Sequence, residues 1–239
     1  MKESKVEKAL IIQEIEATYK PLSANQILTL IKKEKNLFLI ATLNIKYTKK
    51  EYQEIEQLLK TKKVKGIKLY PGYESFYPTD KRCDLIYDLC EKYDIPVIFH
   101  SGDTHESLIP IKYAMPIHID EVACKRRNLK IIIAHLGNPW IDDTMMVLSR
   151  HKNVYADISG LIYGTFDQPL VKHLRQEIHK LIFWCAGVDK LLFGTDWPIN
   201  HSVKHNLMSA YIKFVKSLDI SKQDQKKILE ENAKKVFKM

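Results

Sequence analysis

The sequence lacks both a membrane span and a secretory leader. No apolar stretch approaches the roughly 20 residues that a membrane-spanning helix needs. The first ten residues, MKESKVEKAL, are charged from the second residue onward, whereas a secretory signal needs a continuous apolar segment. These absences predict no membrane partner and a cytoplasmic location.

Cysteine is scarce, and its spacing excludes a paired redox or metal motif. The four cysteines are Cys83, Cys90, Cys124 and Cys185, and none forms a CxxC pair. Cys83 and Cys90 are seven residues apart, which places them on one face of a helix. We therefore expect reduced, buried thiols in a cytosolic protein rather than a disulfide framework.

The chain has no recognisable nucleic-acid motif, although its formal net charge is +9. Its lysines occur singly or in pairs with glutamate and aspartate between them, as on the solvated faces of helices. This pattern predicts a basic surface and no nucleic-acid partner. We expect a small-molecule substrate, and an anionic one would benefit from the positive charge.

No linker, repeat or low-complexity tract divides the 239 residues, which predicts a single domain over residues 1–239. That length suits one α/β barrel. Apolar strand-like runs alternate with amphipathic helical runs throughout. The fourth of the seven expected strands is the central one, which ends at His100. The others are expected at Lys8–Ile12, Leu37–Leu43, Gly66–Tyr70, Ile131–His135, Val154–Ile158 and Leu191–Thr195.

The helices follow the strands in order. Ser23, Thr48, Thr79 or Asp80, and Ser221 are the expected N-caps. The later helices are expected at Ile117–Arg126, Asp142–Arg150, Gln168–Trp184, Val203–Leu218 and Lys222–Phe237. Seven strand–helix units predict an α/β fold of the TIM (β/α)8-barrel type that lacks its first strand.

Three apolar strands end in polar residues suited to metal or acid–base chemistry. His100 ends the run IPVIFH, His135 ends KIIIAH, and Asp196 follows LLFGT. The carboxyl ends of parallel strands meet at one edge of a sheet, where α/β proteins bind ligands. We therefore expect these three side chains to converge at one mouth of the barrel.

Several motifs in order resemble the amidohydrolase-related family, whose members are TIM-barrel metal-dependent hydrolases and decarboxylases. They are GIKLYPGYESFYPTD, IPVIFHSGDTH, HIDEVA, IIIAHLGNPW, NVYADISGL, LLFGTDWP and ILEENAKKVF. In that family a histidine follows strand five, another follows strand six, and an aspartate follows strand eight. By this resemblance, the three positions correspond to His100, His135 and Asp196.

The family's His-x-His pair at the end of its first strand has no counterpart, because no histidine precedes His100. The resemblance thus implies a divalent metal, zinc above all, held by His100, His135 and Asp196. A catalytic zinc site usually has three protein ligands plus an open position. In this family the equivalent of His135 more often contacts substrate or the activated water. We therefore expect a weakly held ion.

The resemblance implies that Asp196 takes a proton from water and passes it to the leaving group, while His135 acts as acid/base or stabilises charge. Lys68 and Tyr70 end one strand, and Thr104 follows His100; these three are candidate substrate contacts. For Lys68 a structural ion pair, for example with Asp103, stays open. We expect surface positions without a role for His118, His151, His173, His179, His201 and His205.

The implied activity is metal-dependent hydrolysis of a small carboxylated or cyclic substrate. Two alternatives stay open: decarboxylation by the same residues, and a non-catalytic barrel, which the missing His-x-His pair favours. A missing strand also leaves a gap between Lys8–Ile12 and Leu191–Thr195. These strands can pair with each other, the helix Lys222–Phe237 can cover the gap, or a second copy can do so. We favour the second copy and hence a homodimer.

Overall fold

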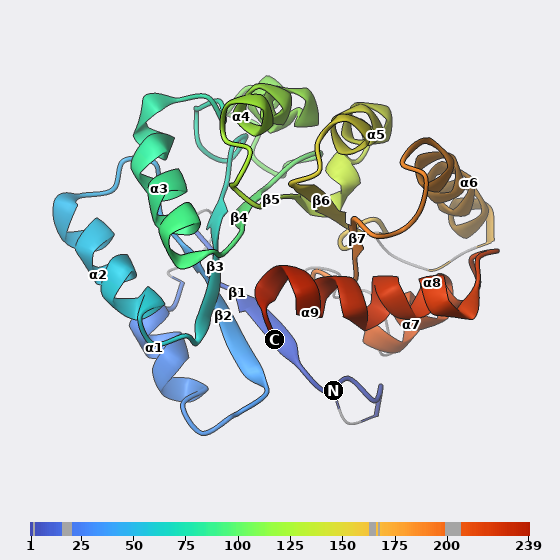
Figure 1. Ribbon diagram of the computed structural model, residues 1–239, viewed down its shortest axis with the longest axis horizontal. Helices are drawn as coiled ribbons and strands as arrows, with labels where there is room; N and C mark the ends of the chain where they lie inside the picture. Colours follow the sequence, from blue (N-terminus) through green and yellow to red (C-terminus); the bar gives the residue numbers. More distant parts are fainter. Residues whose placement is uncertain (2, 16–20, 163–165, 167, 199–206) are drawn as a thin grey trace.

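A computed structural model shows seven parallel strands in one curled sheet with the order β1 to β7 (Figure 1). The structure describes residues 1, 3–15, 21–162, 166, 168–198 and 207–239. The strands are β1 Ala9–Ile12, β2 Leu37–Thr42, β3 Val64–Leu69, β4 Val97–Phe99, β5 Ile131–Ile133, β6 Val154–Asp157 and β7 Leu191–Leu192. This is the α/β barrel, short of one strand, that the sequence predicts.

The strands are apolar on both faces because both faces are covered. On β4, Val97 and Phe99 pack into the large cluster between sheet and helices. Ile98 between them points to the opposite face and joins the smaller cluster inside the curl. This division explains why the central strands show no polar alternation in the sequence.

The helices form an outer arc around the curled sheet, as Figure 1 shows for α1 to α6. Ser23 and Thr48 each close a capping box at the start of a helix, as the sequence predicts. The helices are α1 Ala24–Leu30, α2 Lys49–Leu59, α3 Asp84–Tyr93, α4 Ile119–Lys125, α5 Ile141–Arg150, α6 Gln168–Trp184, α7 Leu207–Lys216, α8 Lys222–Lys226 and α9 Asn232–Phe237.

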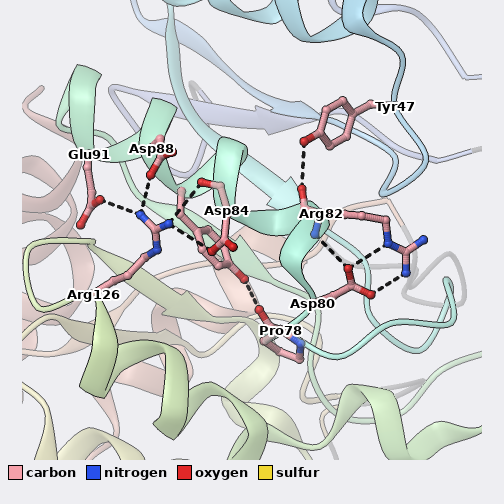
Figure 2. Close-up of polar contacts among 9 residues, drawn as sticks. Tyr47, Pro78, Asp80, Arg82, Asp84, Asp88, Glu91 and Arg126 are labelled. Atoms are coloured by element: carbon pink, nitrogen blue, oxygen red, sulfur yellow. Dashed lines mark hydrogen bonds and ion pairs between the residues drawn. The ribbon is translucent and has the colours of Figure 1, made fainter.

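Arg126, directly after α4, ties this helix to α3 (Figure 2). Its guanidinium lies 2.7 Å from Asp88, 3.0 Å from Glu91 and 3.1 Å from Asp84. It also lies over the ring of Tyr87, 5.3 Å from the centroid. One planar cation thereby collects three carboxylates along one helix, which fixes the spacing of two neighbouring helices.

The gap between the first and last strands stays open, because the described residues of β1 and β7 do not pair with each other. Val236 and Phe237 of α9 pack against Ile40, Ile98 and Leu192 inside the curl. The terminal helix therefore covers part of the barrel interior, which was one of the three expected arrangements. The homodimer stays a prediction, as does the single domain.

Several element bounds differ from the sequence-based expectation, and the largest differences concern β7 and the C-terminal helix. β7 ends at Leu192 and not at Thr195, and Asp196, four residues later, takes a left-handed conformation. The expected helix Lys222–Phe237 is divided by a π-helical turn at Lys227–Glu231. Residues 203–206 of the expected helix Val203–Leu218, together with His201 and His205, lie outside the described residues.

Within the part of the chain that the structure describes, no helix combines the length and apolar character needed to cross a membrane. All four cysteines are free thiols. Cys83 and Cys90 are buried, as expected, but Cys124 is exposed on α4 and Cys185 is partly buried. The expectation of four buried thiols is therefore wrong for the last two.

Candidate functional site

His100 follows β4 directly and is buried, with 6% of its surface exposed. Its Nε2 donates a hydrogen bond to the carbonyl oxygen of Asp103 at 3.0 Å, since a carbonyl can only accept. Burial lowers the pKa of His100 well below its usual range, and electrostatic interactions with the neighbouring His135 and Lys68 lower it further. The imidazole is therefore neutral and keeps the Nδ1 lone pair for a ligand.

His135 follows β5 and takes a left-handed backbone conformation, with φ of 60°. Its backbone N–H donates to Oδ1 of Asp157 at 3.1 Å. Its Nδ1 donates to Oγ of Ser159 at 2.9 Å, and Ser159 in turn donates to Asp157 Oδ1 at 2.5 Å. This relay places a proton on Nδ1 and leaves Nε2 as the ring nitrogen that can bind a ligand.

The two imidazoles are neighbours, with ring centroids 5.2 Å apart. His100 also contacts Tyr73 edge-on at 4.8 Å between centroids and lies near the ring of Tyr70 at 6.2 Å. The strand ends therefore bring His100 and His135 together as the sequence predicts. Each ring has one nitrogen committed to a donated hydrogen bond and one available as a metal ligand.

Asp196 faces His135 across Gly160. A Cβ built on Gly160 would lie 3.1 Å from Oδ2 of Asp196 and 2.7 Å from Nδ1 of His135. Asp196 has φ of 56° and Gly160 has φ of 63°. Left-handed conformations cost free energy at non-glycine residues and are concentrated at functional sites. Their occurrence at both His135 and Asp196 therefore indicates a functional site here.

Lys68 is the buried cation of the site, with 2% of its surface exposed. Burial lowers its pKa, while the carboxylates of Asp157, Asp196 and Glu14 raise it. The acidic groups that act on Lys68 are thus at the barrel mouth, and Asp103 is not among them. For Glu14, burial raises the pKa, Lys68 lowers it, and Asp196 raises it.

Tyr70 and Thr104 are the other candidate substrate contacts; Tyr70 follows a strand, whereas Thr104 lies in a loop. The Tyr70 hydroxyl donates to the carbonyl of Gln13 at 3.1 Å, which joins the end of β3 to the end of β1. Burial raises the pKa of Tyr70 well above its usual range. Thr104 lies in the loop after His100, and its hydroxyl donates to the carbonyl of Glu106 at 3.5 Å. A substrate role for either residue stays a prediction.

A cavity of about 1520 Å³ opens along the gap between β1 and β7. Its wall includes Glu14, Asp157, Ser159 and Asp196 at the carboxyl ends of the strands. Trp197, next to Asp196, also lines it and is exposed. His100 and His135 are not part of the wall, so a ligand in this cavity meets the acidic residues first.

The donor types of this site suit a divalent metal, although among the described residues no three of its ligand atoms lie within 4.8 Å of one another. His100 and His135 each offer one ring nitrogen that donates no hydrogen bond, and Glu14 and Asp196 add carboxylate oxygens. Imidazole and carboxylate together suit zinc, manganese and iron. A cation would also relieve the repulsion between the carboxylates that contributes to the raised pKa of Glu14.

The sequence analysis missed Glu14 and the Asp157–Ser159 relay. Both follow the rule that located His100, because Glu14 comes two residues after the end of β1 and Asp157 ends β6. The hydrogen bonds of Ser159 link two strand ends and leave no local signal in the sequence.

The fold is shared with solved TIM-barrel structures. An uncharacterized TIM-barrel protein from Bordetella bronchiseptica superposes with a TM-score of 0.78 at 22% identity, over 99% of this chain and 79% of that one. A probable 2-pyrone-4,6-dicarboxylic acid hydrolase from Acinetobacter baumannii, solved with citric acid bound, gives 0.74 at 18% identity, over 100% and 86%.

A 5-carboxyvanillate decarboxylase from Novosphingobium aromaticivorans, solved with manganese and 4-hydroxy-3-methoxy-5-nitrobenzoic acid, gives a TM-score of 0.63 at 16% identity, over 90% of this chain and 68% of that one. No curated protein sequence matches the chain significantly. The family model described as amidohydrolase matches residues 23–239, which is most of the sequence. The chain therefore belongs to the amidohydrolase family.

Proposed function

We propose that this chain catalyses metal-assisted hydrolysis of a small carboxylated or cyclic molecule at the barrel mouth. The observation that carries the proposal is the meeting of His135 and Asp196 across Gly160, where both residues hold left-handed backbone conformations. Two strained residues that face each other at the carboxyl edge of a parallel sheet match the requirements of an active site.

His100, His135, Asp196 and Glu14 would hold the ion, so Glu14 adds a fourth donor to the three that the sequence predicts. When bound, a zinc or manganese ion would lower the pKa of water and polarise the scissile bond. The hydrogen bond from His100 to Asp103 and the one from His135 to Ser159 fix the orientation of the two rings for metal binding.

In this proposal Asp196 accepts the proton of the attacking water and returns it to the leaving group. His135 would hold the ion through Nε2 and would act on the charge of the substrate through that ion, while the Ser159–Asp157 relay holds its ring in place. Lys68 balances the charge of the nearby carboxylates. Because Lys68 is only 2% exposed, charge balance is the role proposed for it, and its contact with substrate stays a prediction.

Decarboxylation is the second candidate, because one similar fold is a manganese-containing 5-carboxyvanillate decarboxylase. The two reactions differ in product rather than in scaffold. Carbon dioxide is released by decarboxylation, whereas hydrolysis of a lactone or ester releases a new acid group. Product analysis therefore separates them.

The test is a turnover assay with small carboxylated lactones, esters and aromatic acids in the presence of manganese or zinc. We expect acid release without carbon dioxide, and loss of this turnover in Asp196→Asn with an unchanged circular-dichroism spectrum. Carbon dioxide release would favour the decarboxylase. Acid release that persists in Asp196→Asn would remove this residue from the mechanism and contradict the proposal.

A further inference from the structure

A second group of metal-ligand side chains lies in the outer helix layer, away from the residues of the barrel mouth. Asp120 and Cys124 belong to α4, and His151 follows the last residue of α5. One ligand atom of each, a carboxylate oxygen, the thiol sulfur and a ring nitrogen, lies within 4.8 Å of the other two. Three different donor types thus converge from two neighbouring helices.

The fold places these side chains firmly. Asp120 and Cys124 are four residues apart on α4 and share one face of the helix. His151 ends α5, where its backbone N–H donates to Val147 and its carbonyl accepts from Lys190 Nζ at 2.8 Å. The His151 side chain is only 11% exposed, so its imidazole faces α4 rather than solvent. The sequence-based expectation of a surface histidine is therefore wrong.

We propose that Asp120, Cys124 and His151 form a zinc site that joins α4 to α5. Thiolate, imidazole and carboxylate are the ligands that zinc binds tetrahedrally, at roughly 2.0–2.3 Å. Such bond lengths place ligand atoms roughly 3.3–3.8 Å apart. His151 Nε2 lies 2.7 Å from Asp120 Oδ1 and 4.0 Å from Cys124 Sγ, which brackets this range.

A hydrogen bond from His151 to Asp120 explains why these two side chains lie together, but it does not explain the position of Cys124. The proton on Nε2 serves Asp120 well at 2.7 Å and reaches the Cys124 sulfur poorly at 4.0 Å. Cysteine is among the most frequently buried residues, yet Cys124 is exposed beside this imidazole. A cation bound to Nε2 in place of the proton can contact all three side chains. Its fourth coordination position is then open to water.

Binding has a defined proton balance. The Cys124 thiol releases its proton to solvent and coordinates as thiolate, while His151 binds through Nε2 in the tautomer that carries its proton on Nδ1. With one carboxylate and one thiolate, the two negative charges match the double charge of the ion. The site therefore needs no further charged ligand.

Arg150 is the cation that competes with the metal. Its Nε lies 3.5 Å from Asp120 Oδ1, and its side chain is 58% exposed. A guanidinium at this distance repels a divalent ion and must swing into solvent when the ion binds. Replacing Arg150 with an uncharged residue should consequently strengthen metal binding, which loss of a merely structural contact would not do.

This site can be distinguished from the barrel mouth by its sulfur ligand. No cysteine lines the cavity beside Glu14 and Asp196, and all four cysteines lie within the described residues. A cobalt(II) ion bound by a thiolate shows a sulfur-to-metal charge-transfer absorption that nitrogen and oxygen ligands do not give. The two sites therefore have separate spectroscopic readouts, whatever the outcome at the barrel mouth.

The experiment is a cobalt(II) titration of the reduced full chain, followed by displacement with zinc. We expect the thiolate absorption in the unaltered chain and in the matched control Cys185→Ser, and its loss in Cys124→Ser. His151→Gln should weaken binding by roughly tenfold or more, and Arg150→Gln should tighten it. Circular dichroism checks that each variant is folded.

Two results would overturn the proposal. One is the absence of the thiolate absorption in the unaltered chain. The other is its persistence in Cys124→Ser, because a different cysteine would then supply the sulfur. A zinc affinity that is equal in Arg150→Gln and the unaltered chain would contradict the competition between this guanidinium and the ion, and with it the placement of the metal beside Asp120.

Discussion

His135 and Asp196 approach the same point from two strand ends. A Cβ at Gly160 would lie 2.7 Å from Nδ1 of the histidine and 3.1 Å from Oδ2 of the aspartate. Only a residue without a side chain leaves these groups in place. The conformation of Gly160, with φ of 63°, adds a second reason for glycine at this position.

Gly160→Ala should therefore reduce turnover sharply. The added methyl group must displace the His135 ring or Asp196, and misplacement by about 1 Å can cost on the order of 100-fold in rate. The left-handed backbone adds a stability loss of about 1–2 kcal/mol. Steady-state kinetics and chemical denaturation measure the two effects separately.

Gly187→Ala is the matched control for this change. Gly187 has φ of 138°, so alanine is also strained there, but no atom lies within 4 Å of the added Cβ. We expect lower stability with unchanged turnover per folded molecule. Equal loss of turnover in both variants would show that backbone strain, and not the contact with His135, causes the defect.

Arg126→Met should lower the free energy of unfolding by about 1–2 kcal/mol, because the methionine keeps an apolar stem beside Tyr87 but leaves three carboxylates without their cation. The loss should shrink at high salt, where charges are screened. Lys50→Met is the control, since the Lys50–Glu54 pair is exposed. Equal effects of the two substitutions in urea denaturation would refute a special role for Arg126.

Glu74 should make stability depend on pH. Burial raises its pKa from 4.5 to about 7, and its Oε2 has no hydrogen-bond partner among the described residues. The folded protein therefore holds this proton more tightly than the unfolded chain. The resulting stabilisation is complete below pH 4.5, declines as the pH rises toward about 7, and is absent above that value.

Glu74→Gln isolates this contribution. Allowing for the partial exposure of the side chain, we expect the wild-type chain to lose on the order of 2 kcal/mol relative to this variant between about pH 5 and pH 8. Urea denaturation at both pH values gives the comparison. A difference between wild type and variant that does not change with pH would mean that Glu74 titrates normally.

The open gap beside β1 leads to our prediction of a homodimer. The strand pairs with β2 on one side, and among the described residues no strand occupies its other side. Unpaired edges with apolar side chains attract a partner, and Leu10 and Ile12 line the open cavity. Light scattering in dilute solution should give twice the chain mass; a monomer would rule this out.

Much of the fold was predictable because the relevant signals are local. The buried strand at Val97–Phe99 and the caps Ser23 and Thr48 are visible in neighbouring residues. His100 and His135 were found because each directly follows an apolar run. The convergence of these residues followed from the rule that parallel strands end at one edge.

The remainder depends on contacts between distant segments. The early end of β7 at Leu192 and the left-handed turn at Asp196 could not be inferred from LLFGTDWP, which looks like one longer strand. Burial of His151 depends on how α5 meets α4, and the role of Ser159 depends on its position under His135. Contacts between such distant segments cannot be inferred from the spacing of residues in the sequence.

The proposed function rests on a divalent metal held at the barrel mouth by His100, His135, Asp196 and Glu14. The most direct test is equilibrium dialysis with manganese on the Cys124→Ser chain. Manganese prefers oxygen and nitrogen ligands, and the substitution removes the sulfur of the second site. Asp196→Asn and Glu14→Gln in the same background complete the set.

We predict one manganese ion per chain in Cys124→Ser, with affinity reduced by roughly tenfold or more in each added variant. Asp196→Asn and Glu14→Gln each remove a charged oxygen donor while keeping the shape of the side chain. A chain that binds no manganese, or that binds it equally well with and without these two carboxylates, would rule out this metal site.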